Sequence, residues 1–108
     1  YQGVTDAWID QWHLDSNHGD DNIINLRPNG VLRGLIKFDL EGMLPDHIRI
    51  TSADLYLYDN GGGPDMTINF YPLTRSWDES SVTYNQAASS QPWATAGGDY
   101  ASNPVASL

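Results

Sequence analysis

The chain has 108 residues and a mass of 12.0 kDa, which is enough for one domain with a single core. Its 14 acidic residues outweigh 5 basic ones, giving a net charge of −9. This charge disfavours nucleic acid and anionic membrane surfaces as partners, because phosphate binding needs clustered Lys and Arg. The absence of cysteine excludes a disulfide framework, a thiolate nucleophile and a zinc–thiolate site.

Strand periodicity dominates the sequence, and Gly and Pro interrupt it roughly every eight to twelve residues, a spacing typical of an all-β sandwich. Helical periodicity is weak throughout. No apolar run approaches the ~20 residues of a membrane span, so membrane insertion is not expected. In chain order, strands are predicted over residues 7–14, 22–27, 31–39, 48–58 and 66–73.

The third predicted strand follows Pro28-Asn29-Gly30, and Asn-Gly between two apolar runs is a strong turn signal. Within this strand Leu32, Gly34, Ile36 and Phe38 are expected to share one face. The opposite face carries Arg33 and Lys37. A short extended or helical piece is predicted near the turn at residues 77–84. The predicted organisation is an N-terminal extension (1–5), a β-sandwich body (6–85) and an irregular tail (86–108).

Four segments together resemble the DNRLRE-type, or disaggregatase-related, domain. They are residues 5–10 (TDAWID), 32–40 (LRGLIKFDL), 50–58 (ITSADLYLY) and 74–85 (TRSWDESSVTYN). The last is the most specific, because it sets Trp, Glu, Val, Thr and an aromatic residue at defined spacing. The resemblance implies an extracellular jelly-roll β-sandwich, and it implies kinship with carbohydrate-binding modules, since some family members act as such.

The chain does not match the C-terminal strands of that family, and its five predicted strands compare with about eight in a jelly roll. Two interpretations remain open. The chain is a segment of a longer polypeptide, or a neighbouring chain donates the missing strand. A donated strand gives a head-to-tail contact, and such a contact makes a filament when it does not close. Residues 1–5 and 85–108 are the segments expected to reach a neighbour. The start at Tyr1 fits a secreted chain whose leader was removed, or such a segment.

Aromatic residues are abundant, with 4 Trp and 6 Tyr. Exposed rings are what a glycan-binding face requires, because sugars stack their C–H faces on them, whereas buried rings fill a sandwich core. We predict a structural turn built by Arg75, Trp77, Glu79 and Tyr84, with an Arg75–Glu79 ion pair. The predicted glycan-binding residues are Trp8, Trp12, Tyr56 and Tyr58.

The acidic loop after the first predicted strand offers oxygen ligands of the kind that calcium takes, although the same residues are ordinary turn formers. A structural calcium ion is the one cofactor that the sequence suggests. Its predicted ligands are Asp15, Asn17, Asp20 and Asp21.

Catalytic motifs are absent: there is no G-x-S-x-G elbow, phosphate-binding loop or G-x-G-x-x-G. Asp78 and Glu79 are a poor carboxylate pair, because adjacent strand residues point to opposite faces. The sequence predicts a non-catalytic extracellular or cell-surface module that forms a homo-oligomer or homopolymer by strand complementation, as in a fibre or matrix. The alternative is a carbohydrate-binding module that recognises a polysaccharide. Arg33, Lys37 and Arg49 are candidates for a local basic patch.

Overall fold

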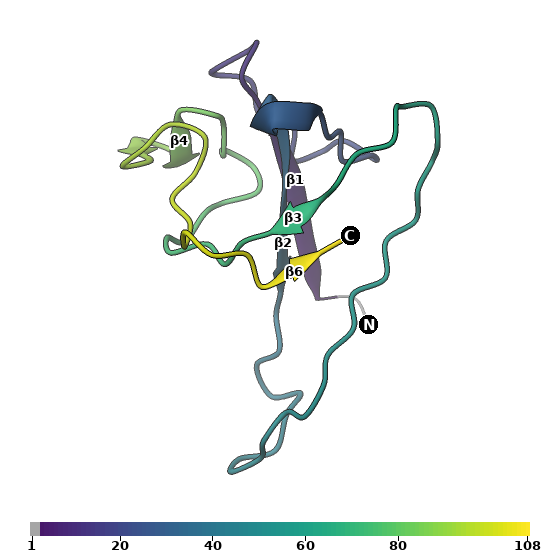
Figure 1. Cartoon of the computed structure of the whole chain (residues 1–108). Helices are drawn as coiled ribbons and strands as arrows, with labels where there is room; N and C mark the ends of the chain where they lie inside the picture. The colour runs from purple at the N-terminus through teal and green to yellow at the C-terminus, as the bar shows by residue number, and fades with distance from the viewer. Residues whose placement is uncertain (1–2) are drawn as a thin grey trace.

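The computed structural model describes residues 3–108, and these residues form antiparallel strands and one short 3-10 turn, η1 (Pro28–Gly30), with no α-helix among them. The predicted all-β antiparallel class is confirmed. The strands form three two-stranded sheets, instead of the two large packed sheets of a jelly roll (Figure 1). The pairs are β1 (Val4–Asp10) with β2 (Leu32–Phe38), β3 (Asn69–Phe70) with β6 (Ala106–Ser107), and β4 (Gln86–Ala88) with β5 (Gln91–Pro92).

The β1–β2 pair is the longest, running in unbroken register from Val4↔Phe38 to Asp10↔Leu32. β1 begins and ends earlier than the predicted strand at 7–14. It ends at Asp10 because the Asp10 carboxylate accepts hydrogen bonds from the Trp12 N–H (2.8 Å) and the His13 ring (2.6 Å). A side chain that bonds to the backbone two residues ahead turns the chain and stops the ladder.

The predicted Asn-Gly turn is present just before β2. Asn29 and Gly30 both have positive φ (61° and 68°), as a tight hairpin-type turn requires. The strand predicted before it, residues 22–27, does not form. The segment is held against β2 by a bond from the Arg27 N–H to the Leu32 carbonyl (3.2 Å) and by the side chains of Ile24 and Leu26, which lie against Gly34.

Both faces of β2 carry a buried leucine, Leu32 on one face and Leu35 on the face that also carries Arg33 and Lys37. Leu35 lies in the core, and its neighbours on the same face, Arg33 and Lys37, lie over the Tyr84 and Trp77 rings at 5.7 and 5.1 Å. Long cationic side chains cover aromatic rings with their stems and cation–π contacts, so a face with two cations can still pack on the core. The core consists of Ala7, Ile9, Leu35, Trp77, Val82, Tyr84, Ala87 and Trp93, with Leu73 packed against it.

The strand predicted at residues 48–58 is unpaired in the structure. The segment carries no strand, turn or bend and is exposed along its whole length. Figure 1 shows residues 39–68 as a long teal loop beside the sheets. The strand predicted at 66–73 is shortened to β3. Alternating apolar residues are therefore not sufficient here, because a strand also needs a neighbouring edge to pair with.

The C-terminal region packs on the body, in contrast to the predicted free tail. Trp93 is buried, and its indole N–H donates to the Thr83 carbonyl (3.0 Å). β4, β5 and β6 all lie within residues 86–108, and at the other end Val4 and Thr5 belong to β1. The segments expected to reach a neighbouring chain are thus paired internally. Residues 1–2 of the predicted N-terminal extension lie outside the described residues.

Candidate functional site

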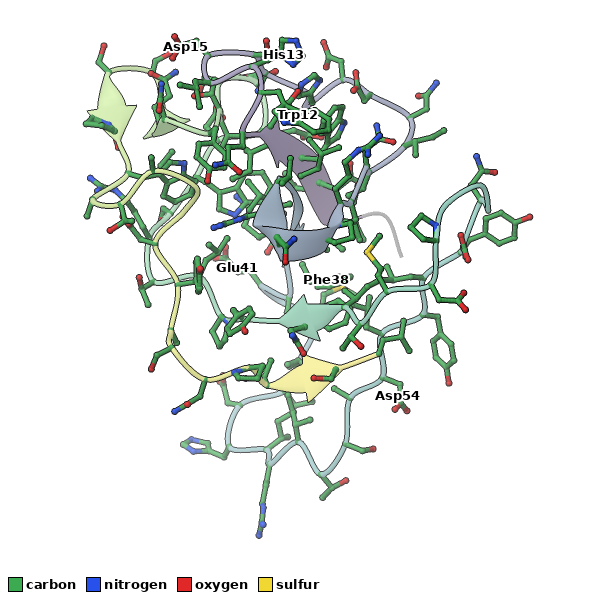
Figure 2. All side chains as sticks on the ribbon, turned by 45° about the horizontal axis from the view of Figure 1, so that its top comes forward. Trp12, His13, Asp15, Phe38, Glu41 and Asp54 are labelled. Carbon is green, nitrogen blue, oxygen red and sulfur yellow. The ribbon has the colours of Figure 1, made fainter. Side chains whose placement is uncertain are left out.

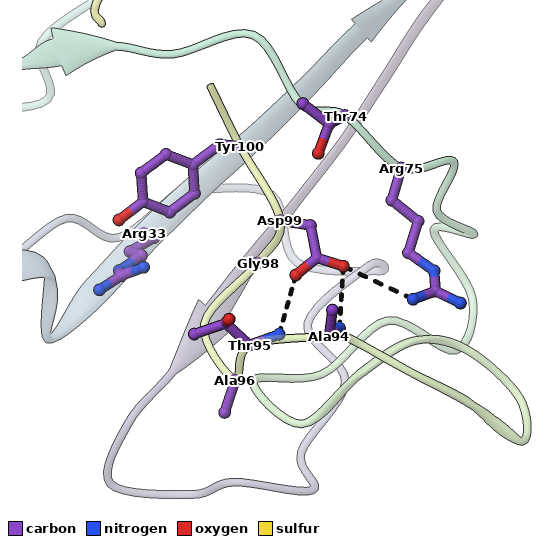
Figure 3. Close-up of a pocket in the computed structure, with 9 residues that line it drawn as sticks. All are labelled: Arg33, Thr74, Arg75, Ala94, Thr95, Ala96, Gly98, Asp99 and Tyr100. Atoms are coloured by element: carbon purple, nitrogen blue, oxygen red, sulfur yellow. Dashed lines mark hydrogen bonds and ion pairs between the residues drawn. The ribbon is translucent and has the colours of Figure 1, made fainter. Parts of the chain in front are cut away.

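A pocket of about 630 Å³ opens where the C-terminal region meets β2 and the chain after β3 (Figure 3). We call it the Tyr100 pocket. Its walls come from three places far apart in the sequence: the start of β2, residues 74–75 and residues 94–100. The lining residues are Arg33, Thr74, Arg75, Ala94–Ala96, Gly98, Asp99 and Tyr100.

The side chain of Asp99 is fixed inside this pocket. Its two carboxylate oxygens accept hydrogen bonds from the backbone N–H groups of Ala94 and Thr95, both at 2.9 Å. These bonds, with a smaller contribution from the Arg75 guanidinium 3.5 Å away, lower the pKa of Asp99 below its usual range. The pocket therefore holds an ionised carboxylate beside a guanidinium whose side chain is 39% exposed.

A second guanidinium closes another side of the pocket. Arg33 donates to the carbonyls of Gly30 (2.9 Å) and Gly97 (2.8 Å), and it lies 5.7 Å from the centres of the Tyr84 and Tyr100 rings. Gly97 has a φ of 94°, and a Cβ there would crowd the Arg33 guanidinium and the Tyr84 hydroxyl. Glycine at this position is what permits the close approach.

The Tyr100 ring forms the aromatic part of the pocket and is 44% exposed. It packs at 5.1 Å against the ring of Tyr71, which is also partly exposed. The backbone beneath is held by a bridge between Leu73 and Tyr100 and by flanking hydrogen bonds from Thr74 to Asp99 and from Ala101 to Pro72, both 2.9 Å. An open ring next to fixed donors and acceptors can take a ligand with one apolar face and several hydroxyl groups.

The four predicted glycan-binding aromatics do not form one surface. Trp8 is buried, stacks on the His18 ring at 3.6 Å and donates its indole N–H to Asp21 (2.8 Å), so its faces are not free for a sugar. Trp12 is exposed and lies under the Arg27 guanidinium at 4.9 Å. Figure 2 shows Trp12 well apart from Asp54, which belongs to the same exposed 48–58 segment as Tyr56 and Tyr58.

The residues predicted to bind calcium are engaged in other contacts. Asn17 donates to the carbonyls of Glu79 and Val82 (both 2.8 Å), Asp15 accepts from Asn85 (3.0 Å), and Asp21 accepts from Trp8. Asp20 is exposed. Within residues 3–108 no group of three or more His, Cys, Asp or Glu side chains is suited to hold a metal ion. The calcium site therefore stays a prediction.

The predicted turn is built around two buried rings, because Trp77 and Tyr84 both lie in the core. The expected ion pair is different: Arg75 pairs with Asp99 and not with Glu79, since Asp99 is held in place by two backbone N–H groups.

The three residues predicted to form a basic patch lie in different surroundings. Arg33 and Lys37 pack on core aromatics, whereas Arg49 lies on the exposed 48–58 segment.

Sequence reasoning missed Tyr71, Asp99 and Tyr100 as site residues. Asp99 and Tyr100 stand in a region without strand periodicity, whereas Tyr71 lies on the strand predicted at residues 66–73. The contacts that bring Tyr71 to Tyr100 and Arg75 to Asp99 join segments distant in the chain. The one local signal was Gly97-Gly98, both with positive φ, which marks a sharp turn that presents the next two side chains.

An all-β domain whose exposed aromatic ring adjoins a fixed carboxylate and two guanidinium groups has the make-up of a sugar-binding domain. The model of Carbohydrate-binding module family 96 matches residues 1–103, and the chain belongs to this family. Such modules bind and do not catalyse. The match confirms the carbohydrate-binding part of the resemblance seen in the sequence, while the DNRLRE-type assignment stays a prediction.

No curated protein and no solved structure matches the chain. Among residues 3–108 there is also no helix both long and apolar enough to cross a bilayer.

Proposed function

We propose that this chain is a non-catalytic module that holds a polysaccharide in the Tyr100 pocket. Family membership supports carbohydrate as the ligand class. The observation that carries the choice of site is the exposed Tyr100 ring beside the Asp99 carboxylate, which is already oriented by two backbone bonds. Preorganised polar groups lose little entropy when a ligand binds.

The chemistry of the pocket fits a sugar ring. The C–H face of a pyranose stacks on Tyr100, a hydroxyl group donates to Asp99, and a neighbouring oxygen accepts from Arg75. Hydrogen bonds to charged groups contribute about 1.5–3 kcal/mol each, more than bonds between neutral groups. The pocket therefore selects ligands with adjacent oxygen atoms next to an apolar face.

Affinity gel electrophoresis against a panel of soluble glucans, mannans, xylans, galactans and polyuronates tests the proposal. Wild-type protein is expected to be retarded by at least one polymer. Tyr100→Ala removes the stacking ring and should abolish the retardation, whereas Tyr100→Phe keeps the ring and should preserve it. Tyr58→Ala is the matched control, because Tyr58 is 93% exposed and lies outside the pocket. If no polymer retards the wild type, or Tyr58→Ala alone releases it, the pocket assignment is wrong.

The proposed setting is extracellular or at a cell surface, where polysaccharides are found, and the family supports this setting. The predicted fibre or matrix role is not carried forward. It relied on residues 1–5 and 85–108 pairing with a neighbour, and the described parts of both segments pair inside the chain.

A further inference from the structure

The dipeptide Asn-Gly occurs twice in the chain, at Asn29-Gly30 and at Asn60-Gly61. This pair has a chemistry of its own, because the backbone nitrogen of the glycine can attack the side-chain amide carbon of the asparagine. Glycine has no Cβ to shield that nitrogen. The two pairs are equal in sequence, so a difference in their reactivity must come from the structure around them.

The first pair is fixed in the turn before β2, where Asn29 and Gly30 have φ values of 61° and 68°. The Gly30 carbonyl accepts a hydrogen bond from Arg33 (2.9 Å), and three atoms of that guanidinium would lie within 3.2 Å of a Cβ at Gly30. Arg33 is also bonded to the carbonyl of Gly97 (2.8 Å). Rotating this peptide toward the Asn29 side chain would disturb contacts that join the turn, β2 and the C-terminal region.

The second pair stands clear of the body of the protein, on the long loop of residues 39–68 (Figure 1). Residues 59–63 are all exposed, and a Cβ at Gly61, Gly62 or Gly63 would meet no atom within 4 Å. Among the described residues, no backbone-to-backbone hydrogen bond involves positions 59–63. This peptide can therefore rotate without breaking a packed contact.

The nitrogen that would attack in the second pair is already bonded to a carboxylate. The Gly61 N–H donates to Oδ1 of Asp59 at 2.7 Å. A general base must lie within about 2.6–3.2 Å of the proton that it removes, and this bond meets that condition. The first pair lacks the same arrangement, because the residue before Asn29 is Pro28, which has no carboxylate.

We propose that Asn60 is a site of spontaneous deamidation in this protein, with Asp59 as the general base. Asp59 takes the proton of the Gly61 amide as the Gly61 nitrogen bonds to Cγ of Asn60. The Cγ–Nδ2 bond of Asn60 then breaks, and ammonia leaves with that proton. A water molecule opens the resulting cyclic imide to aspartate or isoaspartate. No group is oxidised or reduced, and water is the one co-reactant.

The product differs from the original chain in charge and in backbone. Each modified chain carries one more carboxylate, close in sequence to Asp59 and Asp65. Isoaspartate also routes the backbone through the former side chain and lengthens it by one methylene. Both changes fall on the exposed loop, outside the core and the Tyr100 pocket, so the modification does not depend on sugar binding.

Incubating the purified chain in neutral buffer made with heavy-oxygen water tests the proposal. Because water opens the imide, the label enters the new carboxyl group, and fragment mass spectrometry assigns it to one residue. Label should accumulate at Asn60 much faster than at Asn29. Equal labelling of the two positions, or no labelling at Asn60, would overturn the proposal.

Asp59→Ser separates the base from the turn, since a serine hydroxyl can still accept the Gly61 N–H but is a far weaker base. Labelling at Asn60 should slow about tenfold in this variant. This is less than the ~10²–10⁴ typical of a general base in an enzyme, because Asp59 is exposed to water. Asp65→Ser removes another exposed carboxylate of the same loop and should leave the rate unchanged. Equal rates in the two variants would overturn the role of Asp59.

Discussion

Gly19 shows how closely the acidic loop packs on the turn at residues 77–84. A Cβ at this position would overlap the backbone carbonyl of Glu79, the same carbonyl that accepts a hydrogen bond from Asn17. Glycine is needed here for space and not for a left-handed φ, because its φ is not positive. One residue therefore controls how the loop docks on the turn.

We predict that Gly19→Ala destabilises the fold by about 1–3 kcal/mol, since the turn or the loop must shift to relieve the overlap. Gly63→Ala is the matched control: a Cβ at that position would meet no atom within 4 Å, and its φ is not positive. That variant should leave stability unchanged or raise it slightly. Urea unfolding compares the two, and equal effects would show that Gly19 is not a packing constraint.

Two carboxylates, one in the pocket and one on the surface, are expected to make stability depend on acid pH. Bonds from Ala94 and Thr95 lower the pKa of Asp99, and the hydroxyls of Ser81 and Ser80 lower the pKa of Asp78. A folded-state pKa below the unfolded value of about 3.9 means that the stabilisation is complete above that pH and is lost as the pH falls through the folded value.

The thermal unfolding midpoint should accordingly fall as the pH is lowered from about 5 toward 2. Asp99→Asn should show a shallower fall than the wild type, because Asn does not titrate. Differential scanning calorimetry across this range measures both slopes. Parallel curves for the two proteins would exclude Asp99 as a contributor.

At the scale of elements, the β1–β2 pair shows what local pattern can predict. The alternation of residues 31–39 and the Asn-Gly turn before them predicted β2 to within one residue at either end. The face that carries Arg33 and Lys37 also packs on the core, because these two side chains cover Tyr84 and Trp77. Aromatic partners distant in sequence decide which face is buried, and no local pattern shows them.

The 48–58 segment shows the opposite case. Its pattern is that of a strand, and yet it has no partner within residues 3–108. Alternation of apolar and polar residues shows that the side chains suit a pleated strand. Whether the strand forms also depends on the edge of another strand being available to pair with it.

Hydrogen exchange separates these two elements. The β1–β2 amides should be protected at all protein concentrations, because their ladder is internal. In dilute protein the amides of residues 48–58 should exchange close to the rate of an unfolded chain. Strong protection that is independent of concentration would contradict an unpaired segment in the single chain.

For the whole molecule, the sequence pointed to a carbohydrate-binding family but did not point to the pocket that we propose as its site. Tyr56 and Tyr58 remain predicted contacts on an exposed segment, while the pocket assembles Arg33, Arg75 and Asp99 through the fold. Sites assembled from distant segments depend on tertiary contacts that one sequence does not encode locally.

At the same scale, Arg75→Gln should weaken polysaccharide binding about tenfold, because it removes a charged hydrogen-bond donor from the pocket. The Arg75 side chain is not part of the hydrophobic core, so the fold should be retained. Arg49→Gln, a charge loss outside the pocket, is the control and should leave binding unchanged. Isothermal titration with the polymer that retards the wild type most strongly measures both. Equal affinities for the two variants would remove Arg75 from the site.

The most direct test of a carbohydrate site at Tyr100 is an amide NMR titration of the wild-type chain with that same polymer. The largest shift changes should fall on Thr74, Thr95, Asp99 and Tyr100, which line the pocket. Changes confined to Trp12 or to residues 48–58, with the pocket amides unmoved, would contradict this placement of the site.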